Sequence, residues 1–378
     1  MAESKLLAEK DLPIGKPLEW DVFDRKGRLL LRKGMALQSD KQVSKVLSYA
    51  AYRMLEAEEE SIAEPEKNEI LSPFDNIDKT VKDIARVYLT ILKNVASGSA
   101  KIQDQIYSLS QNLIELCEYD VDATLGALHL EKKFQYSILH PVNTAILANI
   151  MAEQLKYEAK KRVSIIAAAL TANIGMFDLQ QKLTKQQEHL SEKQQEAINK
   201  HPVNSAVLLK HWGVRDRLWL EVVLQHHEQK DGSGYPRRLS HEKFIQEARI
   251  VGIADRYHAL LSPRGYRRGL LPTEALSRLF KERGKEVDEE LTLMFVREVG
   301  IYPPGSVVKL KNGDTAIVTR RGEDKMKPMA KSIFNEKGVI LPVPVQRDTG
   351  YKLQEITGMC QSIPEFKPNL KVLWDYDL

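Results

Sequence analysis

The order of hydrophobic and polar positions at the start of the chain predicts a small mixed module. Residues 17–37 alternate between apolar and polar side chains around the turn Asp24–Gly27, which indicates a short β-hairpin. A helix with one apolar face follows and begins at Ser39 or Asp40, because both side chains can cap a helix. We therefore expect residues 1–55 to form a small β/α module.

Residues 56–72 are acidic, contain proline and have too few apolar positions for a core, so they predict a solvated linker. Residues 73–118 then carry two narrow helical seams in steps of four and three, separated by a break at Ser97–Ser99. The two helices form either a hairpin packed on the next domain or a signalling coiled coil that makes a homodimer. The hairpin is favoured, because each seam is shorter than three to four heptads. The seam positions are Ile77, Val81, Ile84, Tyr88, Ile91 and Val95, then Ile102, Ile106, Leu109, Leu113 and Leu116.

The remaining pattern is mainly helical and then β-rich. Residues 119–300 read as helices with glycines at the turns, whereas residues 301–378 form a small β-rich C-terminal extension. Within this extension, residues 307–318 alternate around Asn312 and Gly313, which indicates a hairpin with a type I′ turn. The predicted fold class is mainly α.

Composition limits the class of partner. A balance of 56 basic and 52 acidic residues leaves a net charge of +4, so no strong basic field predicts nucleic-acid binding. Only Cys117 and Cys360 are present, which suits a reducing compartment rather than a disulfide framework. No secretion signal and no run of about 20 apolar residues is evident, so we expect a cytoplasmic protein without a membrane segment.

The stretch HHEQKDGSGYP, from His226 to Pro236, is the most specific chemical signal in the chain. Adjacent imidazoles beside a glycine-rich turn are unusual, and His226 and His227 would lie about 100° apart on a helix. Two further histidines in HP segments, His140 and His201, and the carboxylate Asp255 are expected on separate helices. Inward-facing histidine and carboxylate groups of this kind hold metals in helical bundles.

With these residues in view, the chain resembles the HD-GYP family of bacterial phosphodiesterases, which hydrolyse cyclic di-GMP at a centre of two or three metals. The resemblance covers roughly residues 119–318, through HHEQKDGSGYP, the block IADRYHALLSPRGYRRGLLPTEAL and the segment VGIYPPGSVVKLKNGDTAIV. It implies an HD-domain helical bundle with a GYP loop.

The resemblance also implies roles for individual residues. Arg264 and Arg267 match basic residues that hold substrate phosphates, and Tyr235 and Asp231 fall in the nucleotide-binding signature loop. The loop is linked in the family to contacts with diguanylate cyclases or other signalling proteins, and its residues here are Gly232, Gly234, Tyr235 and Pro236. The implied metal ligands are His140, His201, His226, His227 and Asp255.

The chain departs from the family where the namesake His-Asp pair is expected. Ala172 and Asn173 stand at those positions, and Met176 replaces the lysine that commonly follows. Tyr136 stands where a three-metal member has a glutamate, and His258 replaces a second aspartate. No residue can therefore be assigned a certain catalytic role, and the metal-bridging carboxylate is lost.

These substitutions affect the two metal positions differently. One position keeps only His140 and Asp255, whereas His201, His226 and His227 still offer three nitrogen ligands to iron (Fe), manganese (Mn) or zinc (Zn). The sequence predicts one divalent metal where the family has two. Since a pair of metals stabilises both the attacking and the leaving oxygen, efficient hydrolysis is not expected.

Three functions remain open from sequence. The leading hypothesis is a cyclic di-GMP signalling protein that binds nucleotide or protein partners with little or no phosphodiesterase activity. The first alternative is an active phosphodiesterase with a reduced metal centre, in which Asn173 donates a carbonyl oxygen. The second is an interaction scaffold that does not bind nucleotide.

Overall fold

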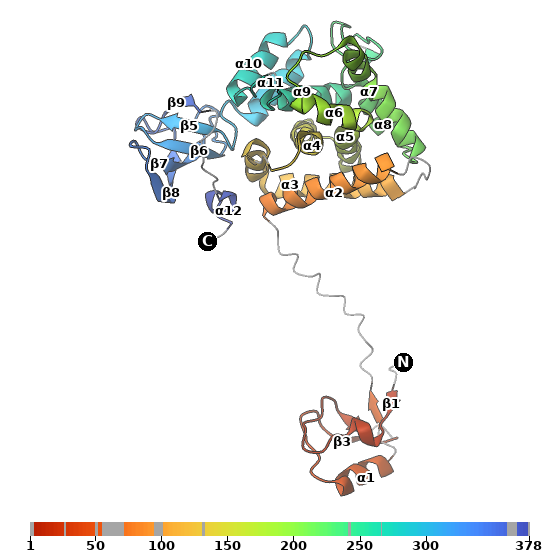
Figure 1. Cartoon of the computed structure of the whole chain (residues 1–378). Coiled ribbons are helices and arrows are strands. Elements are labelled where there is room, and N and C mark those ends of the chain that lie inside the picture. The colour runs from red at the N-terminus through yellow and green to blue at the C-terminus, as the bar shows by residue number, and fades with distance from the viewer. Residues whose placement is uncertain are drawn as a thin grey trace. The chain divides into compact units, whose positions relative to one another are not determined.

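The computed structural model divides the chain into two compact units, Met1–Ile70 and Leu71–Leu378 (Figure 1). The predicted linker at 56–72 lies almost entirely outside the described residues, as do the predicted break Ser97–Ser99 and two residues of the first turn, Lys26 and Gly27. The structure describes residues 4–25, 28–49, 52–54, 72–93, 101–130, 133–240, 243–265, 267–360 and 369–376.

The first unit is a four-stranded sheet with one helix. The predicted hairpin is the antiparallel pair β2/β3, in which Val22 lies opposite Leu31. The predicted helix starts after Ser39, although the Ser39 side chain makes no capping hydrogen bond. The elements are β1 (Ser4–Leu6), η1 (Glu9–Asp11), β2 (Val22–Phe23), β3 (Leu29–Leu31), α1 (Asp40–Ser48) and β4 (Tyr52–Met54), with strand order β1-β4-β2-β3.

The second unit is built around one helix that is buried on every side. Every residue of α4 from Ser137 to Ala152 is buried, as expected for a helix that is apolar almost all round. The neighbours α3, α5 and α9 pack around it. The helices are α2 (Pro73–Lys93), α3 (Lys101–Leu130), α4 (Tyr136–Gln154), α5 (Ala159–Thr171), η2 (Ile174–Met176), α6 (Phe177–Lys185), α7 (Glu192–His211), α8 (Arg217–Gln225), α9 (Gln246–Leu261), α10 (Pro272–Glu282) and α11 (Glu289–Val299).

The two seams are buried within the same chain. Helices α2 and α3 lie side by side along the bundle (Figure 1), and Ile84 and Ile106 are completely buried. The described seam residues belong to the same core cluster as α4 and α5. A coiled coil with a second subunit would need these seams to be exposed, so the structure has the hairpin and not that alternative.

A five-stranded antiparallel sheet follows the helices, in the order β8-β7-β6-β5-β9. The hairpin predicted around Asn312 and Gly313 is present, but only Gly313 has a positive φ, of 90°. The type I′ prediction is wrong, because that turn needs positive φ at two residues. The elements are β5 (Val307–Leu310), β6 (Thr315–Arg320), β7 (Met329–Phe334), β8 (Ile340–Asp348), β9 (Ile356–Met359) and α12 (Leu370–Leu373).

The sheet and α12 are joined to the helical bundle at the kink in α3. Asp120 has non-helical dihedrals, and its carboxylate accepts hydrogen bonds from Arg320 and from the Tyr376 hydroxyl. Burial alone would raise the pKa of Asp120, but the Arg320 hydrogen bond brings it below its usual value. The Trp374 ring lies against Gly126 so closely that a Cβ on that glycine would come within 2.3 Å of it. The mainly helical fold with a small C-terminal sheet, as predicted, is confirmed.

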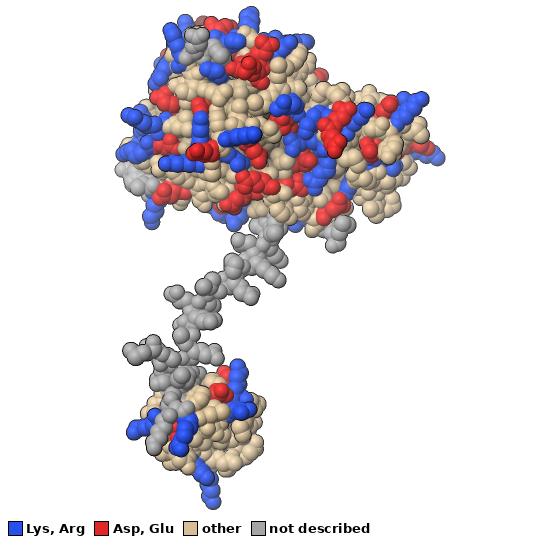
Figure 2. Space-filling view, turned by 180° about the vertical axis from the view of Figure 1, so that it is seen from behind, with Lys and Arg blue, Asp and Glu red and all other residues tan. Residues whose placement is uncertain are grey.

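One helical stretch, Ala159–Lys185, is long and apolar enough to cross a membrane by length and composition alone. Of its most apolar window, 72% is buried inside the unit, which is also what a core helix of a globular domain shows. On the face of the second unit seen in Figure 2, basic and acidic side chains lie interspersed. That face offers no extended field of one sign to an anionic polymer.

Replacing Trp374 by alanine is expected to lower the free energy of unfolding of the second unit by about 3–5 kcal/mol. The side chain is 3% exposed and joins α12 to α3, so its loss leaves a cavity between the sheet and the helices. Urea denaturation followed by circular dichroism measures this. The control is Leu353→Ala, whose side chain is 68% exposed. An unchanged helical transition in the Trp374 variant would contradict this packing.

Candidate metal centre and nucleotide pocket

Three histidines from neighbouring elements converge on one point. His201 lies on α7, and His226 and His227 follow the end of α8 at Gln225. One ring nitrogen of each lies within 4.8 Å of the other two, and His201 Nε2 is 3.3 Å from His226 Nε2. The expectation that the histidine pair sits on a helix is wrong, since both residues lie in the turn that ends α8. The turn still aims both rings at His201.

The orientation of two of these rings is set by backbone carbonyls. His201 Nδ1 lies 2.6 Å from the Ile198 carbonyl oxygen, and His226 Nδ1 lies 2.8 Å from that of Val223. A carbonyl only accepts, so each Nδ1 carries the proton and each Nε2 presents a lone pair. Metal-binding histidines are held in this way by their outer partners.

Burial keeps the three imidazoles neutral. It lowers the pKa of His201 to about 3, with a further contribution from His226. The pKa of His226 is also lowered by burial, and that of His227 is held well below its usual value by burial and by the neighbouring His226. Neutral nitrogen donors fit a borderline divalent ion. The histidine triad, meaning His201, His226 and His227, therefore passes this chemical test for a metal.

The signature loop is anchored beside the triad by hydrogen bonds to its backbone. The Glu228 carboxylate accepts from the backbone N–H groups of Arg237 and Leu239, each at 2.7 Å. Gly234 has no space for a side chain, because a Cβ there would lie 2.5 Å from the His227 carbonyl oxygen. The loop is thus held against the histidine turn.

The loop turns Tyr235 inward. Its ring stacks on His227, with ring centroids 4.7 Å apart, and lies 6.1 Å from the His201 ring. Asp231 instead points to its own turn, where it accepts from the Ser233 N–H and hydroxyl. Of the two loop residues predicted to bind nucleotide, Tyr235 lines the cavities described below, whereas Asp231 is outside both linings.

On the other side of the site, His140 and Asp255 bind each other directly. His140 Nε2 of α4 lies 2.7 Å from Asp255 Oδ1 of α9, and Asn173 Nδ2 donates to the same oxygen at 3.3 Å. Ala172, with 1% exposure, ends α5 just before Asn173. The buried Asn173 Oδ1 has no hydrogen-bond partner among the described residues. A hydrogen-bonded pair with an amide thus stands where the resemblance implies a metal position.

A relay of hydrogen bonds reaches this pair from α3. Asn143 Nδ2 donates to the Leu128 carbonyl and lies 2.9 Å from His258 Nε2, which must accept. His258 then carries its proton on Nδ1, 2.8 Å from His140 Nδ1, and donates to it. His140 therefore holds its proton on Nε2 and donates it to Asp255. The chain of donors ends on the carboxylate.

The charges of the relay follow from burial and pairing. Burial, together with His140, holds the pKa of His258 well below its usual range, so this imidazole is neutral. Burial alone would raise the pKa of Asp255, but attraction to His140 and their hydrogen bond keep it well below its ordinary value. The carboxylate is the one anion of this network. Sequence reasoning missed Asn143, although it lies three residues after His140 in the HPVN segment.

Aromatic stacking covers the relay on the pocket side. The Tyr136 ring stacks on His140 at 4.7 Å between centroids, and the Arg264 guanidinium lies 3.8 Å above Tyr136. Burial raises the pKa of Tyr136 to about 12. Arg267, by contrast, donates to the Ala259 carbonyl at 2.9 Å at the end of α9. The structure therefore places Arg264, and not Arg267, in a pocket lining.

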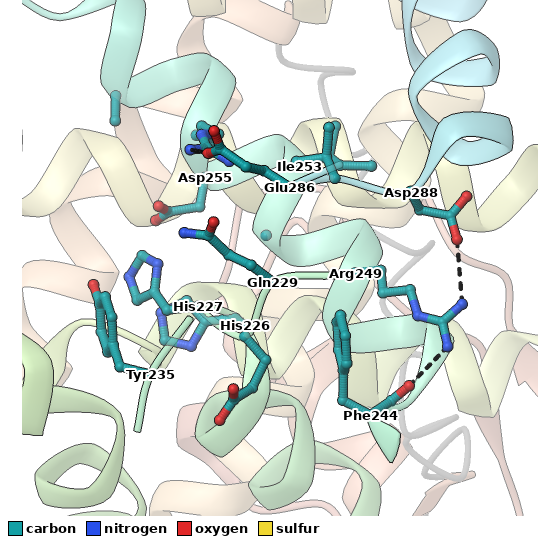
Figure 3. Close-up of a pocket in the computed structure, with 15 residues that line it drawn as sticks. His226, His227, Gln229, Tyr235, Phe244, Arg249, Ile253, Asp255, Glu286 and Asp288 are labelled. Atoms are coloured by element: carbon teal, nitrogen blue, oxygen red, sulfur yellow. Dashed lines mark hydrogen bonds and ion pairs between the residues drawn. The ribbon is translucent and has the colours of Figure 1, made fainter. Parts of the chain in front are cut away.

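Two cavities flank the site and share part of their lining. Cavity A has a volume of about 300 Å³ and is shown in Figure 3. Cavity B has a volume of about 190 Å³ and is lined by Tyr136, Asn173, Met176 and Arg264, among others. The residues common to both are His227, Tyr235, Asp255 and Ala259. A ligand that fills both cavities would pass directly beside the triad.

The part of the chain that contains these residues is similar to known proteins. Residues 126–291 match the family described as HD domain. The cyclic di-GMP phosphodiesterase PA4108 of Pseudomonas aeruginosa is 29% identical over 226 residues, 60% of this chain and 54% of that protein. This part of the chain is therefore similar to HD domains, and the relative from Pseudomonas aeruginosa is named a cyclic di-GMP phosphodiesterase.

Two further proteins are similar to this chain. The cyclic di-GMP phosphodiesterase PdeB of Borreliella burgdorferi is 28% identical over 181 residues, 48% of this chain and 48% of that protein. A solved structure of Bd1817, an HDG"Y"P protein from Bdellovibrio bacteriovorus, is 15% identical with a TM-score of 0.49, covering 78% of this chain and 98% of that chain. The chain spans about half the length of the curated relatives that it matches.

The HD domain is expected to be purified with about one divalent metal per chain, bound by the histidine triad. His201→Ala removes a metal ligand whose ring is oriented by the hydrogen bond from Nδ1 to the Ile198 carbonyl. The metal content should therefore fall severalfold or more. Elemental analysis by mass spectrometry of the purified protein measures this. His211→Ala, at the exposed end of the same helix, is the matched control. Equal metal content in the two variants would exclude the triad as the metal site.

Proposed function

We propose that this chain binds cyclic di-GMP across the two cavities and hydrolyses it little or not at all. Cyclic di-GMP is the nucleotide that the names of the similar proteins give. The observation that supports low activity is the 2.7 Å hydrogen bond between His140 and Asp255. This bond and the Asn173 amide occupy the atoms that a second metal would need.

The charge that develops in the transition state would be stabilised only in part at this site. A metal in the triad would polarise a phosphoryl oxygen, but a single ion cannot also stabilise the leaving oxygen as a pair of ions does. On the other side of the site, Asn173 offers a neutral amide and His258 a neutral imidazole, so the anionic ligands of a second metal are reduced to Asp255. We therefore expect this site to bind the nucleotide but to hydrolyse it slowly or not at all.

The residues suited to binding are retained. Arg264 keeps a guanidinium at the lining of cavity B, where its position over Tyr136 fixes it for a phosphate. Tyr235 and His227 present a stacked aromatic surface to both cavities. Nucleotide bases bind such surfaces by stacking.

An active phosphodiesterase with a reduced centre is the second candidate. Two observations favour it: the triad is already oriented by backbone carbonyls, and Asn173 Oδ1 has no hydrogen-bond partner among the described residues. An amide oxygen can serve as a neutral ligand for a hard cation. Metal-dependent release of linear dinucleotide would establish this candidate.

A protein partner at the signature loop remains a prediction. Since Tyr235 is turned onto His227, the exposed side chains at the loop that could contact a diguanylate cyclase or another signalling protein include Asp231, Ser233 and Arg237. The scaffold function without nucleotide has less support, because its proposed dimer seams are buried in the chain's own core.

Calorimetric titration of cyclic di-GMP into metal-loaded protein, with product analysis of the same mixture, tests the proposal. We expect binding without linear product. Arg264→Ala should weaken binding by roughly tenfold or more, because a charge-assisted contact to phosphate is lost. Arg268→Ala is the control, since this exposed arginine pairs with Glu274 and lies outside both linings. Absence of binding would refute the receptor function, and rapid product formation would favour the active enzyme.

Restoring the namesake residues should restore activity. The triple variant Ala172→His, Asn173→Asp and His258→Asp adds possible metal ligands around Asp255. It also removes the His258 imidazole, which donates a hydrogen bond to His140. We expect its metal content to rise from about one to about two per chain, and hydrolysis of cyclic di-GMP to rise by at least about 100-fold. Adding His201→Ala to this variant is the control and should abolish the gain. A triple variant that stays folded, binds two metals and hydrolyses no faster would show that the substitutions do not explain low activity.

A further inference from the structure

Cavity A is the larger of the two cavities, and neither the sequence motifs nor the proposed phosphate contact explains it. Arg264 lines cavity B, whereas cavity A extends from the triad toward α9 and the segment before α11. In Figure 3, His227, Tyr235 and Asp255 gather at one end of cavity A, and Phe244, Arg249 and Asp288 form the other end. The amide of Gln229 points into the space between His227 and Asp255.

The walls of cavity A combine apolar surfaces with a polar edge. Phe244 is 5% exposed and Ile253 is 1% exposed, and with Val287 they supply apolar walls. Arg256 and Glu286 form an ion pair in this polar part, which also contains Glu228, Arg249, Asp255 and Asp288. Apolar walls with a few placed polar groups are typical of pockets for small organic ligands and cofactors. A nucleobase is one such ligand.

The Glu286 carboxylate is held in place but retains an acceptor. Arg256 of α9 donates to Glu286 Oε2 at 2.5 Å and contacts Glu282 Oε2 at 3.2 Å on its other side. Glu286 Oε1 accepts no hydrogen bond from the residues that the structure describes. Its side chain is 30% exposed, so a ligand in the cavity can reach it. A fixed carboxylate oxygen of this kind selects a ligand that presents N–H donors.

Guanine presents such donors. Its N1–H and amino group lie side by side on one edge, next to the O6 acceptor, so a carboxylate beside a guanidinium complements it. Adenine has an unprotonated N1 at the corresponding place, which a carboxylate repels. A cyclic dinucleotide has two bases joined by two phosphodiesters. One base in each cavity would leave a phosphodiester beside the shared residues His227, Tyr235 and Asp255.

We propose that cavity A is a guanine subsite for one half of a cyclic dinucleotide and that Glu286 determines its base specificity. This inference rests on the proposed function and adds the base selection. Cavity B has no comparable carboxylate apart from the shared Asp255. The site therefore requires guanine in one half only.

Binding of three probes tests the subsite: cyclic di-GMP, the mixed 3′,3′-cyclic GMP–AMP and cyclic di-AMP. Wild-type protein is expected to bind the first two with affinities within about threefold of each other, and cyclic di-AMP at least about tenfold more weakly. Glu286→Gln should weaken cyclic di-GMP by roughly tenfold and bring the three affinities together. Glu282→Gln is the matched control, since it removes a carboxylate from the same Arg256 but lies outside the lining of cavity A. It should preserve the wild-type order.

The outcomes separate this inference from the proposed function. If wild-type protein binds cyclic di-GMP and the Glu286 and Glu282 variants behave alike, the guanine subsite is wrong while the receptor function stands. The same holds if wild type binds cyclic di-AMP as tightly as cyclic di-GMP. If no cyclic dinucleotide binds, both fail. Thermal unfolding of each variant confirms that it is folded before titration.

Discussion

The complete burial of α4 is the constraint on which the site depends. This helix carries His140 and Asn143 into a core where water is excluded, and buried polar groups must find partners there. At the positions where the resemblance implies further metal ligands, this chain has Ala172, Asn173 and His258. The buried groups satisfy one another instead, through a chain of donors from Asn143 to His258, His140 and Asp255. Two amide oxygens beside this chain of donors, Asn143 Oδ1 and Asn173 Oδ1, have no hydrogen-bond partner among the described residues.

The two halves of the site are therefore built on different physical principles. On the triad side, backbone carbonyls take the Nδ1 protons, so His201 and His226 keep lone pairs for a cation. On the relay side, His140 Nε2 donates its proton to Asp255 and His140 Nδ1 accepts from His258. Neither ring nitrogen of His140 therefore presents a free lone pair to the pocket. The carboxylate of Asp255 stays anionic and is stabilised by hydrogen bonds from His140 and Asn173. This difference is why binding and hydrolysis are expected to separate in this chain.

The C-terminal sheet stabilises the bundle that holds the site. Asp120 breaks α3 and fastens the kink to Arg320 and Tyr376, while Trp374 fills the space left by Gly126. The helix beyond the kink supplies the Leu128 carbonyl that orients Asn143 and so begins the relay. The sheet and the first hydrogen bond of the relay are therefore attached to the same segment of α3.

Much of this protein was determined by local sequence. The seams of α2 and α3, the mainly helical fold and the residues of the signature loop follow from spacing and residue type, because periodicity and turn chemistry act over a few positions. The sequence alone also places Ala172 and Asn173 where the resemblance implies a His-Asp pair. Only the tertiary structure decided that His140 forms a hydrogen bond with Asp255 and that Glu286 lines cavity A. It also decided that the Arg267 side chain donates to the Ala259 carbonyl at the end of α9. Each of these contacts joins side chains whose partners are set by packing and burial, which no local pattern encodes.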